Sequence, residues 1–164
     1  MERILHPFPP VYDSNSRVLV LGTFPSVKSR EGEFYYHHPQ NRFWKVISTV
    51  YGEMLPTTIE EKKRILLKNK VAIWDVVQSC EITGSADSSI KNAEMNDIGF
   101  LLSQTGIQQI YTNGGTAYRL YMGHVFPQTG REILQLPSTS TANAAFSLEK
   151  LVKQWSCLKE ITGG

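Results

Sequence analysis

The segment of residues 22–44 holds side chains that could bind and orient a planar, polar ligand. It begins with Gly-Thr-Phe-Pro-Ser at residues 22–26 and ends with Phe-Tyr-Tyr-His-His-Pro-Gln-Asn-Arg-Phe-Trp at residues 34–44. Aromatic side chains in a loop can stack on a planar ring, and a base stacked in this way contributes about 1–3 kcal/mol. An alternative is an amphipathic lid, in which Tyr35 and Tyr36 only pack against the domain. The adjacent histidines and the Gln-Asn-Arg run favour a binding site, because a packed core needs neither.

Small polar side chains occur in two later segments. Asn113 is followed by Gly114 and Gly115, and residues 137–146 read Pro-Ser-Thr-Ser-Thr-Ala-Asn-Ala-Ala-Phe. An asparagine amide can both donate and accept hydrogen bonds, and short hydroxyl groups before a helix can contact phosphates. The alternatives are a plain turn at Asn113 and a plain helix-entry loop at residues 137–146.

The apolar pattern of the chain places these segments at one edge of a sheet. Short apolar runs predict four buried strands, at residues 17–22, 71–77, 109–112 and 132–136. Helical patterns alternate with them: one capped by Asn41, one from Thr57 or Thr58 to Leu67, and three at residues 95–105, 116–122 and 147–158. This alternation predicts an α/β, doubly wound, three-layer domain with a central four-stranded, mainly parallel sheet. Ligands bind beyond the carboxyl ends of such strands, where the loops 23–40, 75–94, 113–116 and 137–146 would meet.

Length and composition fit one domain over residues 1–164, with a Pro-rich arm at 1–16 and a flexible tail at 161–164. The formal net charge of +2 neither requires nor excludes a nucleic-acid partner. Cys80 and Cys157 form no disulfide or metal pattern and the histidines lack ligand spacing, so we expect no metal and no cofactor. The chain shows no signal pattern and no apolar run of membrane length, and we expect a cytoplasmic monomer.

Five motifs together resemble the uracil-DNA glycosylase superfamily. They run in family order over nearly the whole chain, and they are Gly22–Ser26 with His38–Trp44, Val71–Val77, Gly84–Ile90, Asn113–Tyr118 and Leu136–Asn143. The chain most resembles the branch of deoxyinosine (hypoxanthine)-DNA glycosylases, which is related to the mismatch-specific uracil/thymine glycosylases. The resemblance implies an enzyme that removes a deaminated or otherwise damaged base from DNA.

One departure from the mismatch-specific pattern bears on the catalytic residue. Those enzymes carry a water-positioning asparagine in a Gly-x-Asn-Pro-Gly motif, whereas this chain has Phe24 at that place and Ser26 instead of the second glycine. The pattern Gly-Thr-Phe-Pro-Ser resembles the deoxyinosine glycosylases, in which an Asn-Arg-Phe-Trp motif supplies the asparagine. The resemblance therefore implies that Asn41 is catalytic, although the same side chain could cap the following helix.

The chemistry of the implied reaction is consistent with an amide. Cleavage of an N-glycosidic bond gives the sugar positive character and the departing base negative charge. Many sugar hydrolases use paired carboxylates for such a step. The acidic residues of the loops form no recognisable pair in the sequence: Glu31, Glu33, Asp75, Asp87 and Glu94. A water held by an asparagine, with oriented donors that stabilise the base anion, fits better.

The resemblance also implies roles for other side chains. The flipped base would contact Gly22, Thr23, Phe24, Tyr36 as the stacking ring and Asn113 as the base-reading amide. DNA would contact Ser26, Lys28, Ser138, Thr139, Ser140 and Asn143. We expect hydrolysis of deoxyinosine without a lyase step, because no lysine has a recognisable Schiff-base position. The alternatives are another base, such as uracil, or a non-catalytic nucleic-acid-binding module on this fold.

Overall fold

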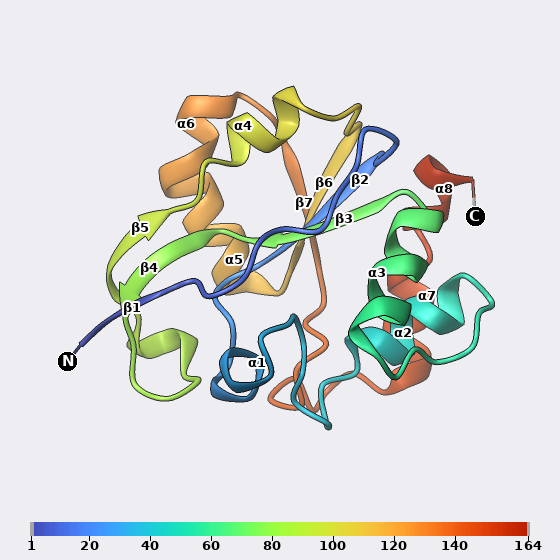
Figure 1. The fold of residues 1–164 in the computed structure, drawn as a ribbon, viewed down its shortest axis with the longest axis horizontal. Helices are drawn as coiled ribbons and strands as arrows, with labels where there is room; N and C mark the ends of the chain where they lie inside the picture. The colour runs from blue at the N-terminus through green and yellow to red at the C-terminus, as the bar shows by residue number, and fades with distance from the viewer. Residues whose placement is uncertain (1, 164) are drawn as a thin grey trace.

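A four-stranded parallel sheet forms the centre of the computed structural model, which describes residues 2–163 (Figure 1). Its strands lie in the order β3 (Val71–Asp75), β2 (Val18–Gly22), β6 (Gln109–Asn113) and β7 (Ile133–Leu136). All neighbouring pairs run in the same direction. The predicted α/β fold with a four-stranded parallel sheet is therefore confirmed.

Helices cover both faces of this sheet, because successive strand residues point to opposite sides. Val18 and Val20 pack in one buried cluster with α2 (Phe43–Val50), α3 (Ile59–Lys68), α7 (Leu148–Trp155) and α8 (Leu158–Thr162). Leu19 and Leu21 pack in a second cluster with α4 (Ile98–Ser103), α5 (Gly115–Leu120) and the π-helical turn Tyr121–Val125, which α6 (Phe126–Thr129) follows. Figure 1 shows the two groups of helices on opposite sides of the strands.

Short polar side chains begin several helices where the sequence predicts. Thr58 and Glu61 form a reciprocal capping box at the start of α3, and Ser147 caps α7. The start of α2 differs in detail, because Arg42 occupies its N-cap position. Asn41 precedes that position and still accepts a hydrogen bond from the first helical N–H, so it acts on the helix from outside.

A second sheet occupies segments that the sequence leaves irregular. Its order is β1 (Arg3–Leu5), β4 (Val77–Glu81) and β5 (Lys91–Met95), and both pairings are antiparallel. The expectation of an unstructured arm at residues 1–16 and of a polar loop at 78–94 is therefore wrong in part. Strands β1 and β5 contain no fully buried side chain, so they lack the apolar alternation that reveals a strand.

The ends of two other predicted segments also differ. Loop 23–40 contains the helix α1 (Val27–Gly32). Residues 161 and 162, expected in a flexible tail at 161–164, belong to α8. The buried Thr162 bonds through its hydroxyl to the Tyr51 hydroxyl over 2.9 Å, and this packing holds the end of α8 against the domain.

Within residues 2–163, no helix is both long and apolar enough to cross a membrane. Cys80 is buried, Cys157 is half-buried, and both are free thiols.

Candidate active site

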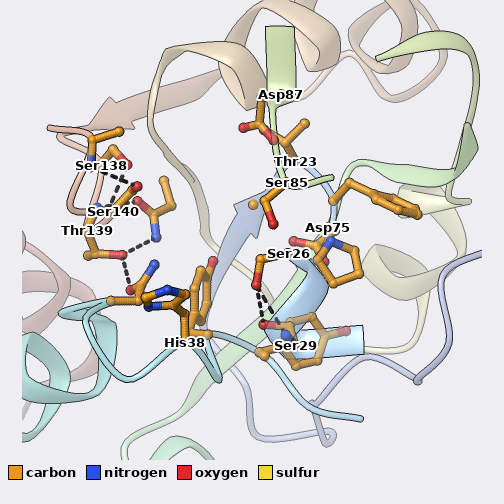
Figure 2. A pocket seen from close by; sticks show the side chains of 18 of the residues that line it. Thr23, Ser26, Ser29, His38, Asp75, Ser85, Asp87, Ser138, Thr139 and Ser140 are labelled. Atoms are coloured by element: carbon orange, nitrogen blue, oxygen red, sulfur yellow. Dashed lines mark hydrogen bonds between the residues drawn. The ribbon is translucent and has the colours of Figure 1, made fainter. Parts of the chain in front are cut away.

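A pocket of about 420 Å³ opens at the carboxyl ends of the parallel strands (Figure 2). The loops that follow β2, β3, β6 and β7 supply its walls, as parallel α/β sheets commonly arrange their sites. In Figure 2, Thr139 and Ser140 lie on one side, and Asp75 and Asp87 lie on the other. The structure brings most of the predicted site residues to this pocket: Gly22, Thr23, Phe24, Ser26, Tyr36, Asn41, Asn113, Ser138, Thr139 and Ser140.

One side of the pocket is a hydrogen-bonded chain of Asn41, Thr139 and Asn113, which we call the amide wall. The Thr139 hydroxyl donates to Asn41 Oδ1 over 2.8 Å, and Asn113 Nδ2 donates to the Thr139 hydroxyl over 3.0 Å. The backbone N–H of Thr139 donates to Asn113 Oδ1 over 3.0 Å. Thr139 is fully buried, so water does not compete for these bonds.

These partners decide which atoms of Asn41 face the pocket. The backbone N–H of Phe43 also donates to Asn41 Oδ1, over 2.9 Å. Two donors use both lone pairs of that oxygen, and the backbone N–H leaves no ambiguity about which amide atom is oxygen. The Nδ2 group of Asn41 is bound to no acceptor among residues 2–163. Asn41 therefore offers N–H donors to a ligand.

The same reasoning limits Asn113. Thr139 occupies the edge of the amide on which the oxygen and one N–H stand side by side. A planar amide that is paired through this edge keeps the other N–H of Nδ2 and the second lone pair of Oδ1, which point in different directions. In this arrangement Asn113 offers a donor to the pocket, rather than the adjacent donor and acceptor that the sequence suggests.

Tyr36 lies over Gly22 with its ring stacked on Phe43, the centroids 4.1 Å apart and the planes 19° from parallel. Its backbone has a φ of 53°, which is unusual for a bulky residue. The hydroxyl oxygen is buried and has no hydrogen-bond partner among the described residues. Burial raises the pKa of this hydroxyl, and the charge of Asp75 raises it further. The nearby Asn113 amide lowers this pKa, although no contact between the two groups meets the geometry of a hydrogen bond. A Cβ at Gly22 would lie 3.0 Å from the same oxygen, so the glycine makes room for this contact.

The opposite side of the pocket carries Asp75 and Asp87, and we call it the carboxylate wall. Asp75 ends β3 directly beside Gly22 of β2. His6 Nε2 lies 2.7 Å from Asp75 Oδ2, and the two side chains are only 3% and 5% exposed. Asp75 Oδ1 lies over Gly22, where a Cβ would overlap it. The N-terminal segment thus delivers a buried histidine to the site.

Asp87 lies at the rim of the pocket in a short 3₁₀ turn, Asp87–Ser89. Burial of the carboxyl group raises its pKa to about 6, Thr23 opposes this rise through a hydrogen bond, and Asp75 adds to it. The residue as a whole is exposed, so the group can exchange protons with solvent. Two carboxyl groups therefore share one pocket, although the sequence shows no recognisable acidic pair.

Arg42 fastens the loop 137–146 to the segment that carries Asn41. Its backbone N–H donates to the Thr139 carbonyl over 3.1 Å. Its guanidinium donates to four backbone carbonyl oxygens, those of Thr139, Ser140, Asn143 and Phe146. These bonds engage the charge of Arg42 within the protein and restrain the loop that positions Thr139.

Comparison with known proteins identifies the family of this fold and pocket. The family model described as the Uracil DNA glycosylase superfamily matches residues 9–161. The chain belongs to this superfamily. It is 37% identical over 145 residues to a protein named Hypoxanthine DNA glycosylase from Methanosarcina acetivorans, and the match covers 85% of this chain and 89% of that relative.

Two further members support the same superfamily assignment. A Hypoxanthine DNA glycosylase from Methanosarcina barkeri is 36% identical over 95 residues, which cover 57% of this chain and 60% of that relative. A solution NMR structure of a candidate uracil DNA glycosylase from Methanosarcina acetivorans superposes with a TM-score of 0.77 at 32% identity. It covers 93% of this chain and 96% of that one. The resemblance inferred from the motifs is thereby confirmed.

Two residues of the predicted site lie outside the pocket of this superfamily member. Lys28 is exposed on α1, and its ammonium group lies 3.8 Å from a Glu31 oxygen. Asn143 lines a neighbouring hollow, and its Nδ2 donates to the Ser138 carbonyl over 3.1 Å. Ser26 does line the pocket, but its hydroxyl oxygen accepts from the backbone of Ser29 and caps α1.

The superfamily motifs contain pocket residues that the sequence reasoning did not select. Asp75 ends an apolar strand at the predicted ligand-binding edge, and this position was a signal that could have identified it. Asp87 lies within a polar motif in which acidic and hydroxyl residues are equally plausible. His38 also lines the pocket, with its Nδ1 accepting from the Gln40 backbone over 3.1 Å. Nothing in the Pro-rich N-terminal sequence singles out His6.

Proposed function

We propose that this superfamily member is a monofunctional DNA glycosylase that hydrolyses deoxyinosine in DNA and releases hypoxanthine. The observation that carries the proposal is the buried hydrogen bond from Thr139 to Asn41, which turns the Asn41 N–H donors towards the pocket. The pocket volume lies within the range of small-molecule sites, about 300–1,000 Å³. The relatives named Hypoxanthine DNA glycosylase support hypoxanthine as the preferred base.

The target nucleotide enters the pocket after it leaves the base stack, because a stacked nucleotide does not expose its glycosidic bond to the enzyme. Phe24 and Tyr36 line the space in which the base would lie. Phe43 covers one face of the Tyr36 ring, so the other face is the one that can contact the base. The remaining N–H of Asn113 donates to the base carbonyl oxygen.

Asn41 acts on the attacking water in this proposal. One Nδ2–H donates to the water oxygen, and the second lone pair of that oxygen remains available for the sugar carbon. A bond forms between the water oxygen and the sugar carbon while the glycosidic bond breaks, and the bonding electron pair leaves with the base. The proton released by the water passes to the base or to solvent. Donors around the base stabilise its developing negative charge.

The other predicted contacts extend the proposal to the DNA backbone. The small polar groups of the 138–140 segment, together with Ser26, border the pocket and can meet phosphate oxygens. Thr139 serves mainly as an internal link, because its side chain is buried. Lys28 and Asn143 would contact DNA outside the pocket. No lysine is among the described residues that line the pocket, which supports a hydrolase without a lyase step.

We also propose that the enzyme acts as a cytoplasmic monomer. The free thiols of Cys80 and Cys157 suit a reducing compartment. One chain supplies every wall of the pocket, so the chemistry needs no second copy. The proposed reaction uses only water and side chains, and it includes no cofactor.

The decisive experiment uses end-labelled duplexes that carry one inosine, uracil, ethenoadenine or adenine. After incubation with the protein, alkali cleaves the strand wherever a base has been removed. We expect cleavage at inosine above all, and none at adenine. Stronger cleavage at uracil or ethenoadenine would show that this other base is the preferred substrate, while the protein would remain a glycosylase of the superfamily. No cleavage of any duplex by folded protein that still binds DNA would indicate a non-catalytic module.

A further inference from the structure

We propose that Asp75, held by His6, is the acceptor that reads the ring N–H of the flipped base, beside Asn113 as the donor that reads its carbonyl. The inference rests on the proposed glycosylase function, and it names the substrate class. That class is the lactam bases, in which a carbonyl and a ring N–H are adjacent. Deamination of adenine creates this edge, because an amino group and a bare ring nitrogen become a carbonyl and an N–H.

The first half of this pair follows from the bonds of Asn113. Thr139 occupies the edge of the amide on which its donor and acceptor are adjacent. The remaining N–H and the second oxygen lone pair point in different directions, so Asn113 cannot bind both the carbonyl and the neighbouring N–H of a base. A lactam edge needs a second group beside it. A ring N–H that is buried without an acceptor costs about 1–3 kcal/mol, so the pocket must supply one.

Strand register places Asp75 where that acceptor is needed. Asp75 of β3 pairs with Gly22 of β2, and Thr112 of β6 pairs with Leu21 on the other side of β2. Asn113 and Asp75 therefore flank Gly22 at the ends of their strands. Gly22 has no side chain to separate them, and Asp75 Oδ1 leans over it.

Contacts around Asp75 leave one oxygen for a ligand. His6 binds Oδ2, which restrains the carboxylate in a site where both side chains are almost fully buried. The hydroxyl of Tyr36 also lies over Gly22, buried and without a partner among residues 2–163. Polar atoms that are unpartnered in such a corner are satisfied when a polar ligand enters.

This arrangement distinguishes hypoxanthine from the adenine of undamaged DNA. Hypoxanthine presents a carbonyl to the Asn113 N–H and a ring N–H to Asp75. Adenine in the same position would direct its amino group at the Asn113 donor and a lone pair at the carboxylate. Sites built on buried hydrogen bonds reject mismatched analogues strongly. The rejection of adenine is therefore a property of Asp75 and Asn113 together.

The exchange Asp75→Asn tests this role. His6 donates to Asp75 Oδ2 when its proton is on Nε2, and the same donor would hold the amide oxygen of the variant. The amide NH₂ would then replace Oδ1, which changes an acceptor into a donor. We expect the preference for inosine over adenine to fall by at least about tenfold, the effect of one hydrogen bond to a charged group. Asp97→Asn also exchanges a carboxylate for an amide, but at the start of α4 and outside the pocket. It is the matched control and should keep this preference within about twofold.

Two readouts separate this inference from the proposed function. Single-turnover excision measures the preference in the reaction, and binding to duplexes with 2′-fluoro-inosine or 2′-fluoro-adenosine measures it without cleavage. If the wild type excises no inosine, the proposed function fails, while the binding preference and its dependence on Asp75 still test the inference. An unchanged binding preference in folded Asp75→Asn, or an equal loss in Asp97→Asn, would overturn it.

His6 is a positioning residue in this scheme, and its variants give a second test. His6→Phe keeps a ring but removes the donor to Asp75, so it should lower the inosine preference. His6→Gln can place an amide N–H near the same oxygen and should restore most of it. Equal preferences in both variants, with thermal unfolding used to confirm that each is folded, would show that His6 has only a packing role.

Discussion

The polar groups on the two walls of the pocket differ in how they are hydrogen-bonded within the protein. On the amide wall, Thr139 bonds to the oxygens of Asn41 and Asn113 and to one N–H of Asn113, and these bonds hold the free N–H donors in place. On the carboxylate wall, Asp75 is bound on one oxygen by His6, and the neighbouring Tyr36 hydroxyl has no partner among the described residues. The first wall is preorganised and the second is left incomplete.

This difference suggests a division of labour between the walls. A hydrogen-bond network that forms without ligand holds its free donors in place during the reaction and needs no rearrangement. A wall with unsatisfied groups gains hydrogen bonds only when a complementary base enters. We therefore assign rate to Asn41 on the amide wall. We assign selection of the base to Asp75 on the carboxylate wall, acting together with the N–H of Asn113.

The largest effect is expected when the amide wall loses its catalytic group. Asn41→Ala should lower single-turnover excision of hypoxanthine by at least about 100-fold, comparable to the loss of one preorganised polar group. Binding to an abasic-site duplex should survive, because the pocket loops and the hydrogen bonds from Arg42 to the loop 137–146 remain. Near-normal excision by the folded variant would remove Asn41 from the mechanism.

A smaller effect is expected when the link between the two amides is cut. Thr139→Val keeps the shape of the buried side chain but leaves Asn41 and Asn113 each without one hydrogen bond. We expect about tenfold slower excision and a loss of about 1–2 kcal/mol in the free energy of unfolding. Chemical denaturation and single-turnover kinetics measure the two quantities.

Thr112→Val is the matched control for this exchange. Thr112 is also fully buried, but its hydroxyl oxygen has no partner among the described residues. Removal of that hydroxyl should leave excision unchanged and should not lower stability. If both variants lose activity equally, the hydrogen bonds of Thr139 have no special role and the amide wall is not preorganised in the way we describe.

The smallest effect concerns the pH dependence of the carboxylate wall. Asp87 has a pKa of about 6 in the folded protein, above the value near 3.9 of a free aspartate. Between about pH 4 and pH 6 the folded state keeps a proton that the unfolded chain has lost, so the contribution of Asp87 to stability falls as pH rises. The Tm of Asp87→Asn minus the Tm of the wild type should therefore be higher at pH 7.5 than at pH 4. Parallel Tm profiles would contradict this pKa.

Much of the architecture was predictable because it follows from local patterns of apolar and polar residues in the sequence. The alternation of apolar strands with amphipathic helices determines a doubly wound sheet, and the loops at the strand ends determine where the pocket lies. Asn41, Asn113 and Ser138 could be selected because they occur in motifs next to those ends. Strands β1 and β5 escaped prediction because they bury too little apolar surface to show a period.

Tertiary structure alone decided how those groups are used. His6 reaches Asp75 across 69 residues of sequence, and Thr139 reaches Asn41 across 98. No local pattern encodes such contacts, because only the packing of distant segments brings the donors and acceptors together. The side chain of Asn41 is an amide in any reading of the sequence. That it offers N–H rather than oxygen to the pocket depends on the two donors that the fold places against its oxygen.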